Sequence, residues 1–301
     1  MFIDVRSPCE YACAHIPGAR NLALFSDEER QQVGLLYKEQ GQATALELGL
    51  NFVGPKLSFF INEAKNLKAP LTIYCARGGM RSEAMAWLLS FAGIKIERLA
   101  GGYKSYRQKV LATFQKPWKL ELIGGLTGVG KTAELHRLKQ EGHQILDLEE
   151  TASHRGSAFG WIAPQPTTEH FENLIAESLL SLNSSLPLFL EDESRFIGTC
   201  KIPDALFSQM QKAPLQLLQS PFQERVERLY NSYGHTNKET LVTNVQKLTK
   251  RLGTERASQI TQLILQNSIK EAIAAILPYY DDAYLMNLRK RSHAGNFDRN
   301  I

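Results

Sequence analysis

The residues best suited to carry out chemistry surround Cys75, in the stretch YCARGGMRS at residues 74–82. A short apolar run precedes this stretch and a helical pattern follows it, which predicts a strand, a tight loop and a helix. Two glycines let the loop turn its amides inward, the helix N-terminus adds partial positive charge, and Arg77 and Arg81 add full charges. We therefore expect Cys75 to be a nucleophile with a lowered pKa inside an anion-binding cradle. The alternative is a buried structural cysteine, which has no need of two neighbouring arginines.

A second stretch with defined chemistry is GLTGVGKT at residues 125–132, which has the Walker A spacing. An apolar strand is expected before it, at 120–123, and a helix after it, the context that the motif requires. Backbone amides of such a loop cradle a diphosphate, Lys131 contacts the terminal phosphate, and Thr132 is a candidate magnesium ligand. The residues predicted to bind phosphate or diphosphate in this loop are Gly125, Thr127, Gly128, Gly130, Lys131 and Thr132.

The Walker loop needs an acidic partner at the end of a later strand. The apolar run at 186–190 leads into Glu191, Asp192 and Glu193. We choose Asp192 as the carboxylate on the magnesium side, with its two neighbours as competitors. The alternative is a solvated strand end, since three adjacent acids leave the role ambiguous.

Two further segments are candidates for the phosphate site. A strand expected at 145–148 opens onto the loop HRGSAFG at 154–160, where Arg155 is a candidate phosphate ligand. Later, Arg225 and Arg228 lie on one predicted helical face and are placed to close over phosphates. A surface turn and a solvated helix face are the corresponding alternatives.

Length and composition predict two domains, 1–115 and 116–301, joined by a linker at 113–119. The chain of 301 residues is 43% hydrophobic and 22% charged, and no apolar run reaches the roughly 18 residues of a membrane helix. Its four cysteines show no metal-binding spacing, which favours a reduced, cytoplasmic setting. Residues 1–115 hold 14 Lys+Arg against 10 Asp+Glu, so the whole surplus of +4 lies in the first domain. This positive charge permits an anionic partner near Cys75. The alternative is that the charge serves only to keep the protein soluble.

Helical patterns occupy much of the remaining chain. We expect helices at about 27–40 and 50–66, whose leucines and aromatic residues are interpreted as packing. From about 241 to 277 the pattern is again helical, with basic residues and, beyond it, tyrosines. Such a region either touches an RNA backbone or forms a helical cap on the P-loop domain.

The first domain resembles rhodanese (sulfurtransferase) domains. The resemblance rests on DVR at 4–6, HIPGARN at 15–21, the Cys75 loop and GGY at 101–103. It implies a small parallel α/β sheet with the reactive cysteine at the carboxyl end of a strand. The Cys-x5-Arg spacing of Cys75 and Arg81 also matches cysteine phosphatases, so that activity stays an alternative.

The two domains together resemble the bacterial tRNA 2-selenouridine synthases. Beyond either domain's generic signature, the stretches GGYKSYR, HRGSAFG and EDESRFIG carry this resemblance. It implies a rhodanese-like parallel sheet with helices, followed by a P-loop NTPase-like α/β domain with a helical C-terminal region. It also implies a transferase that geranylates the sulfur of wobble 2-thiouridine in tRNA with geranyl diphosphate. Selenium from selenophosphate then replaces that sulfur through the reactive cysteine, mapped here onto Cys75.

The resemblance implies selenophosphate and geranyl diphosphate as substrates, Mg²⁺ as a candidate ion and no tightly bound cofactor. The implied partners are tRNA and an enzyme that supplies selenophosphate, with no membrane. Two alternatives from other classes stay open: a sulfur carrier in tRNA thiolation that uses ATP at the P-loop, and a non-catalytic, nucleotide-gated tRNA-binding module. The pattern leaves open which tRNAs are used, the oligomeric state, and whether the P-loop takes ATP.

Overall fold

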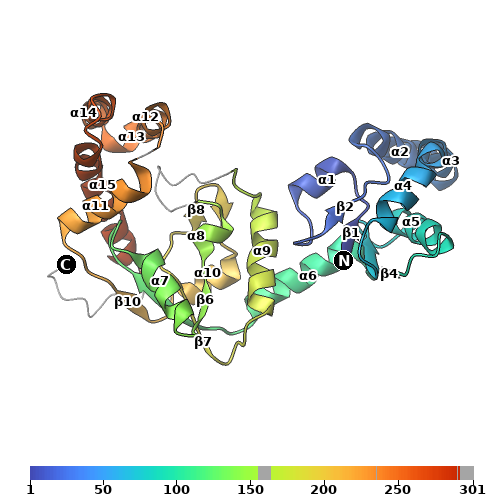
Figure 1. The fold of residues 1–301 in the computed structure, drawn as a ribbon, viewed down its shortest axis with the longest axis horizontal. Coiled ribbons are helices and arrows are strands. Elements are labelled where there is room, and N and C mark those ends of the chain that lie inside the picture. Colours follow the sequence, from blue (N-terminus) through green and yellow to red (C-terminus); the bar gives the residue numbers. More distant parts are fainter. Residues whose placement is uncertain (155–163, 235, 290, 292–301) are drawn as a thin grey trace. The chain divides into compact units, whose positions relative to one another are not determined.

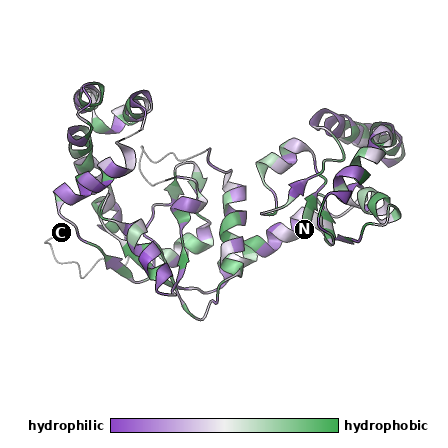
Figure 2. Ribbon diagram, in the orientation of Figure 1, coloured by the Kyte–Doolittle hydropathy of each residue, from purple (hydrophilic) through white to green (hydrophobic). Residues whose placement is uncertain are grey.

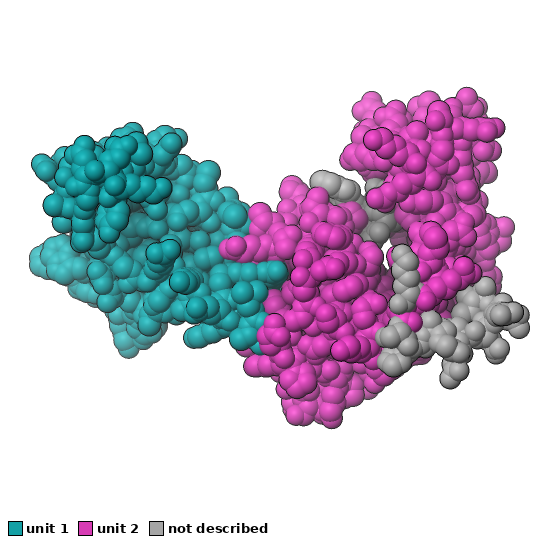
Figure 3. Space-filling view, turned by 180° about the vertical axis from the view of Figure 1, so that it is seen from behind, with its two compact units in different colours: residues 1–113, 172–177 teal, residues 114–171, 178–301 magenta. Residues whose placement is uncertain are grey.

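The computed structural model describes residues 1–154, 164–234, 236–289 and 291, and it divides into two compact units (Figures 1 and 3). Unit 1 contains residues 1–113 and 172–177, and unit 2 contains residues 114–171 and 178–301. Each unit has its own parallel sheet flanked by helices. The predicted fold class is therefore confirmed.

Unit 1 is organised by a four-stranded parallel sheet with the order β2-β1-β3-β4. The two inner strands carry fully buried Ile3, Leu71 and Ile73, as expected for a parallel sheet covered on both faces. The strands are β1 (Phe2–Asp4), β2 (Arg20–Asn21), β3 (Leu71–Tyr74) and β4 (Ile96–Arg98). The helices are α1 (Pro8–Cys13), α2 (Asp27–Gln40), α3 (Gln42–Val53), the 3-10 turn η1 (Gly54–Lys56), α4 (Leu57–Lys65), α5 (Met80–Phe91) and α6 (Gly102–Gln115).

The helices between β2 and β3 confirm one prediction and correct another. Helix α2 has the predicted bounds, because Ser26 caps its N-terminus by accepting a hydrogen bond from the Glu29 amide and Gly41 follows its last residue with φ 87°. The prediction of a single helix over 50–66 was wrong. The chain instead makes two helices around η1, since Pro55 lacks the amide that would continue the ladder.

A buried ion pair supports the sheet beside the cysteine loop. The Arg6 guanidinium donates to both Asp4 oxygens, with Nη2 at 2.6 Å from Oδ2, and it also lies 4.0 Å from the centre of the Tyr103 ring. Asp4 is 0% exposed and Arg6 5% exposed, so each charge is compensated almost entirely by the other. The DVR stretch thus ties the first strand to the segment that backs Cys75.

Unit 2 is organised by a second parallel sheet, with the order β10-β5-β7-β6. The central strands β5 and β7 are therefore neighbours, and their carboxyl ends meet at one edge, where ligands bind in open α/β sheets. The strands are β5 (Lys119–Gly124), β6 (Gln144–Leu146), β7 (Pro187–Glu191) and β10 (Leu215–Leu217), with a separate hairpin of β8 (Phe196–Ile197) and β9 (Cys200–Lys201). The helices before the C-terminal region are α7 (Lys131–Gln140), α8 (Leu148–Thr151), α9 (Thr168–Leu180) and α10 (Asp204–Met210). Residues 172–177 of α9 are counted with unit 1.

The C-terminal region of unit 2 is helical, as predicted. Its helices share one apolar core that includes Val226, Val245, Ile260 and Ile276. The helices are α11 (Phe222–Tyr233), α12 (Lys238–Lys247), α13 (Thr249–Leu252), α14 (Thr254–Leu265) and α15 (Ile269–Arg289). In Figure 2 the helices mix hydrophilic and hydrophobic colour, the pattern of elements that bury one face. Among the described residues, no helix combines the length and apolarity that a membrane crossing requires.

Candidate functional sites

Cys75 lies immediately after strand β3, at the floor of a loop that ends in helix α5. The residue is 3% exposed. Its Sγ lies 3.2 Å from the Ser82 hydroxyl and 3.7 Å from the Gly79 carbonyl oxygen. Ser82 was not among the predicted site residues. Its place seven residues after the cysteine, in the first turns of α5, is the signal that points to it.

The environment of Cys75 favours the thiolate. Burial alone would raise the pKa of the thiol. The Ser82 hydroxyl, the Ser82 and Arg77 amides and the charge of Arg81 outweigh that effect and hold the pKa of Cys75 below its ordinary value. The predicted lowering of this pKa is therefore present in the structure, and hydrogen bonds contribute more to it than the arginines do.

The two predicted arginines have different surroundings. Arg81 Nη1 donates to Glu10 Oε2 at 2.6 Å, and Nη2 reaches Oε1 at 3.4 Å. Arg77 is exposed, and among the described residues its side chain makes no hydrogen bond or ion pair. Arg81 is thus positioned by Glu10 on α1, while Arg77 is available to an arriving anion.

The GGY stretch backs the cysteine loop. The Tyr103 amide donates to the Cys75 carbonyl at 2.9 Å, and the Lys104 amide donates to the Ala76 carbonyl at 2.9 Å. At Gly102, with φ 59°, an added Cβ would lie 2.3 Å from the Cys75 carbonyl oxygen. Only glycine allows this approach, which explains why this stretch accompanies the reactive loop.

Removing the Ser82 hydroxyl is expected to make Cys75 less reactive at neutral pH. Ser82→Ala deletes a hydrogen bond that lowers the pKa of Cys75, so the thiolate should form only at higher pH. The measurement is the pH dependence of iodoacetamide labelling at Cys75, followed by peptide mass spectrometry. Ser90→Ala, at an exposed position of the same helix, is the control. An unchanged inflection in Ser82→Ala would contradict the assignment.

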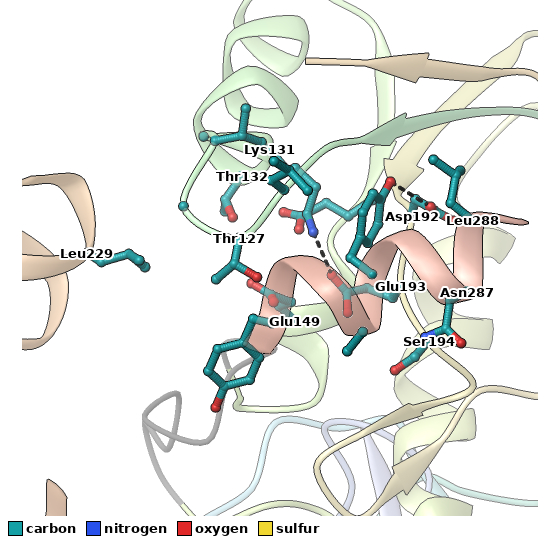
Figure 4. A pocket seen from close by; sticks show the side chains of 18 of the residues that line it. Thr127, Lys131, Thr132, Glu149, Asp192, Glu193, Ser194, Leu229, Asn287 and Leu288 are labelled. Atoms are coloured by element: carbon teal, nitrogen blue, oxygen red, sulfur yellow. Dashed lines mark hydrogen bonds and ion pairs between the residues drawn. The ribbon is translucent and has the colours of Figure 1, made fainter. Parts of the chain in front are cut away.

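The Walker loop joins β5 to α7 and adopts the conformation that its glycines permit. Gly125, Gly128 and Gly130 have φ values of 137°, 80° and 102°. Lys131 and Thr132 begin helix α7, so the loop amides and the helix N-terminus face one cavity of about 790 Å³. Five of the six predicted loop residues, all but Gly125, line this cavity together with the acidic segment after β7. Figure 4 shows Thr127, Lys131 and Thr132 beside Glu193.

Three carboxylates meet beside Lys131. One oxygen from each of Glu149, Glu191 and Glu193 lies within 4.8 Å of the others. Lys131 Nζ lies 3.5 Å from Glu193 Oε1, the contact drawn in Figure 4. Glu149 was missed by the sequence analysis. The strand expected over 145–148 stops at Leu146, and the next residue caps α8, which carries Glu149 into the site.

The protonation of these acids depends on burial. Burial, with the charges of Glu193 and Glu191, raises the pKa of Glu149 to about 9. Burial raises the pKa of Glu191 to about 7, although Lys131 opposes the shift, and burial also raises the pKa of Glu193. Both Glu191 oxygens are buried and accept no well-formed hydrogen bond from the described residues. A cluster of hard oxygen ligands with an unsatisfied member beside the Thr132 hydroxyl fits Mg²⁺.

Asp192, the predicted magnesium-side carboxylate, faces a different set of partners. It accepts a hydrogen bond from the Tyr284 hydroxyl at 3.0 Å and forms an ion pair with Arg291. The Tyr284 hydroxyl in turn accepts a hydrogen bond from the Gly125 amide at 2.9 Å. Asp192 therefore ties α15 to the Walker loop, and the structure favours Glu191 over Asp192 as the carboxylate beside Thr132.

Of the arginines predicted at the phosphate site, Arg225 is placed differently from expectation. Arg225 is 4% exposed; it pairs with Asp281 through two contacts of 2.8 Å and donates to the Thr127 carbonyl at 3.0 Å. Its guanidinium thus links the Walker loop to Asp281 on α15, and these protein partners occupy the group that was expected to bind phosphate. The neighbouring Arg228 lines the cavity and contacts the Gly128 carbonyl. Arg155 lies outside the described residues.

Comparison with known protein families gives a match in each of the two units. A family model described as the tRNA 2-selenouridine synthase AAA domain matches residues 118–300, and the rhodanese-like domain model matches residues 1–109. The chain belongs to the tRNA 2-selenouridine synthase family. Two proteins called tRNA 2-selenouridine synthase illustrate the relationship. That of Pseudomonas putida (strain W619) is 38% identical over a match covering 87% of this chain and 78% of that protein. That of Marinobacter nauticus is 35% identical, covering 88% of this chain and 78% of that protein.

Membership of the tRNA 2-selenouridine synthase family assigns the two sites to one enzyme, a transferase. The rhodanese-like match includes Cys75 and its backing loop, and the AAA-domain match includes the Walker loop and the acidic cluster. The predicted resemblance is confirmed. The roles of individual residues in this synthase stay predictions.

In this synthase, the acidic cluster is expected to make stability depend on pH and magnesium. An ordinary Glu has a pKa of about 4.3, so between that pH and about 9 the folded state binds more protons than the unfolded state. The apparent unfolding temperature without metal should therefore fall as pH rises through this range, and Mg²⁺ should raise it most at high pH. Glu191→Gln should reduce both effects, whereas Glu169→Gln, at an exposed acid that does not line the cavity, should not. Thermal unfolding at pH 6 and pH 8, with chelator or with Mg²⁺, is the measurement. An identical magnesium response in Glu191→Gln would show that Glu191 does not hold the ion.

Proposed function

We propose that this chain converts wobble 2-thiouridine in tRNA into 2-selenouridine through an S-geranylated intermediate. The observation that carries the proposal is the Cys75 loop between β3 and α5, where the Ser82 hydroxyl lies 3.2 Å from Sγ and lowers the pKa of the thiol, in a chain that belongs to the tRNA 2-selenouridine synthase family. Geranyl diphosphate is the alkyl donor, selenophosphate is the selenium donor, and tRNA is the macromolecular partner. Family membership favours this reaction over a sulfur carrier, a cysteine phosphatase and a non-catalytic module.

The first step takes place at the Walker loop. The thiouridine sulfur forms a bond to the first carbon of the geranyl group, the carbon–oxygen bond of geranyl diphosphate breaks, and diphosphate leaves. The base loses its N3 proton to solvent, so the alkylated base is neutral. Lys131 and the loop amides stabilise the negative charge that develops on the leaving diphosphate. Mg²⁺, held by Glu191 with Thr132 and its acidic neighbours, would neutralise further charge on that group. Alkylation makes the sulfur a better leaving group, because it departs as a thiol.

The second step takes place at the Cys75 loop. The thiolate attacks phosphorus in selenophosphate, so that a sulfur–phosphorus bond forms, the phosphorus–selenium bond breaks and selenide is released. Selenide adds to carbon 2 of the alkylated base, and the carbon–sulfur bond breaks to release geranylthiol. Water then cleaves the sulfur–phosphorus bond, which restores Cys75 and gives phosphate. Loop amides and Arg77 and Arg81 form the cradle for the phosphoryl group.

Nucleoside mass spectrometry tests the proposal directly. Thiolated tRNA is incubated anaerobically with the protein, geranyl diphosphate and selenophosphate, and the nucleosides are then separated. We expect S-geranyl-2-thiouridine to appear first and 2-selenouridine to replace it. Persulfide formation on Cys75 with no selenium in the RNA would instead support the sulfur-carrier alternative.

A further inference from the structure

A large apolar cavity within unit 1 opens beside Cys75. Its volume is about 1140 Å³, and it is formed by helices α2 and α3 together with the cysteine loop. Every residue that lines it belongs to unit 1, with Cys75, Arg77 and Arg81 among them. Apolar side chains from several elements contribute to the remaining lining, among them Leu24, Phe25, Leu35, Leu46, Leu50 and Met80. The nucleophile therefore borders a space suited to a hydrocarbon group.

Several of these side chains are exposed, contrary to the packing role expected from the sequence. Leu35, Leu46 and Leu50 are 55%, 44% and 61% exposed, and Met80 is 43% exposed. They come from three helices and gather on one cavity beside a reactive thiol. Exposed apolar side chains that gather in this way mark a binding surface rather than a scatter of isolated residues.

The polar groups around the cavity limit what its occupant is. Glu10 and Arg30 line it, with Arg30 Nε 3.8 Å from Glu10 Oε2, and Glu10 also pairs with Arg81. Arg77 adds an unpaired cation near Cys75. The occupant thus combines an extended apolar part with a polar or anionic part that meets the thiol.

We propose that this cavity binds the isoprenoid chain of S-geranylated 2-thiouridine during the selenium-transfer step. This inference rests on the proposed function, in which the geranyl group is the one extended hydrocarbon among the substrates. Its sulfur is bonded to carbon 2 of the base, the atom at which the selenide released beside Cys75 must react. Binding the chain between α2 and α3 places that carbon at the cysteine loop and gives the departing geranylthiol an apolar site.

The inference predicts a preference for long alkyl groups that depends on the cavity. Leu46→Gln and Leu50→Gln introduce a polar group at exposed positions, where substitution costs little stability. Leu111→Gln, 48% exposed on α6 and outside the cavity, is the matched control. The substrates are two anticodon stem-loop RNAs, one carrying S-geranyl-2-thiouridine and one carrying S-methyl-2-thiouridine, each with selenophosphate.

We expect the cavity variants to raise KM for the S-geranyl RNA by about tenfold and to leave KM for the S-methyl RNA unchanged. Leu111→Gln should behave as wild type with both RNAs. Equal kinetics of all variants on the S-geranyl RNA would overturn the inference. A concentration-dependent dimer that Leu46→Gln dissociates, with unchanged KM, would also overturn it, because a second copy would then occupy the surface.

A binding measurement separates failure of this inference from failure of the proposed function. Fluorescence anisotropy with labelled S-geranyl and S-methyl RNAs needs no turnover. If wild type makes no 2-selenouridine from either RNA, the proposed function fails. Tighter binding of the S-geranyl RNA that Leu46→Gln abolishes would still support the cavity assignment, and equal binding of both RNAs by wild type would refute it.

Discussion

Cys75→Ser is expected to abolish 2-selenouridine formation while S-geranyl-2-thiouridine accumulates. The thiolate is the group that breaks the phosphorus–selenium bond, and a serine hydroxyl at this position has neither the charge nor the nucleophilicity to replace it. Loss of a nucleophile costs on the order of a thousandfold or more in rate. The geranylation step uses groups of unit 2 and should keep the wild-type rate. Nucleoside mass spectrometry over time measures both products.

The control for the loss of a thiol is Cys13→Ser, since Cys13 is exposed and does not line the Cys75 cavity. Added hydrogen selenide gives a sharper test. If the role of Cys75 is to release selenide from selenophosphate, selenide supplied under reducing conditions should restore selenium incorporation by Cys75→Ser above a protein-free blank. Wild-type selenation by Cys75→Ser with selenophosphate would exclude the cysteine as nucleophile.

Lys131→Ala is expected to have the opposite effect. It should lower the rate of geranylation by about a hundredfold to a thousandfold, because the lysine is the cation placed to meet the leaving diphosphate. Burial alone would lower the pKa of Lys131, but the charges of Glu193 and Glu191 raise that pKa, so the group is protonated at every pH used. A pre-formed S-geranyl RNA should still be converted to 2-selenouridine at the normal rate.

Lys139→Ala, an exposed residue in the last turn of the same helix, is the control for this experiment. Geranylation is followed with labelled geranyl diphosphate in the absence of selenophosphate. Normal geranylation by Lys131→Ala would contradict the assignment of the Walker loop as the site that binds the diphosphate. Loss of both steps would indicate instead that the substitution disturbs the acidic cluster around Glu193.

Much of the chemistry could be predicted because it depends on local sequence. The Cys75 loop and the Walker loop each need glycines at fixed positions and a strand before a helix, and these requirements leave a readable pattern. The bounds of α2 depend on local sequence as well, since Ser26 and Gly41 mark its two ends. The helix expected over 50–66 is interrupted at Pro55, which is also a local signal.

The side chains that complete each site could not be predicted in the same way. Among three adjacent acids, only the tertiary structure shows that Tyr284 and Arg291 occupy Asp192 while Glu191 stays without a well-formed hydrogen bond. Arg225 was expected at a phosphate, yet Asp281 and the Thr127 carbonyl occupy its guanidinium. These partners lie between 56 and 99 residues away along the chain.

The sequence by itself determined the two reactive loops, the fold class and the family. Only the tertiary structure decided which acids face Lys131, what holds Arg81, and that Leu46 and Leu50 line a cavity at Cys75. The physical reason is the range of the interactions. Loop conformation and helix ends are governed by neighbours along the chain, whereas burial, ion pairing and cavity shape depend on segments that meet only after the sheets have formed.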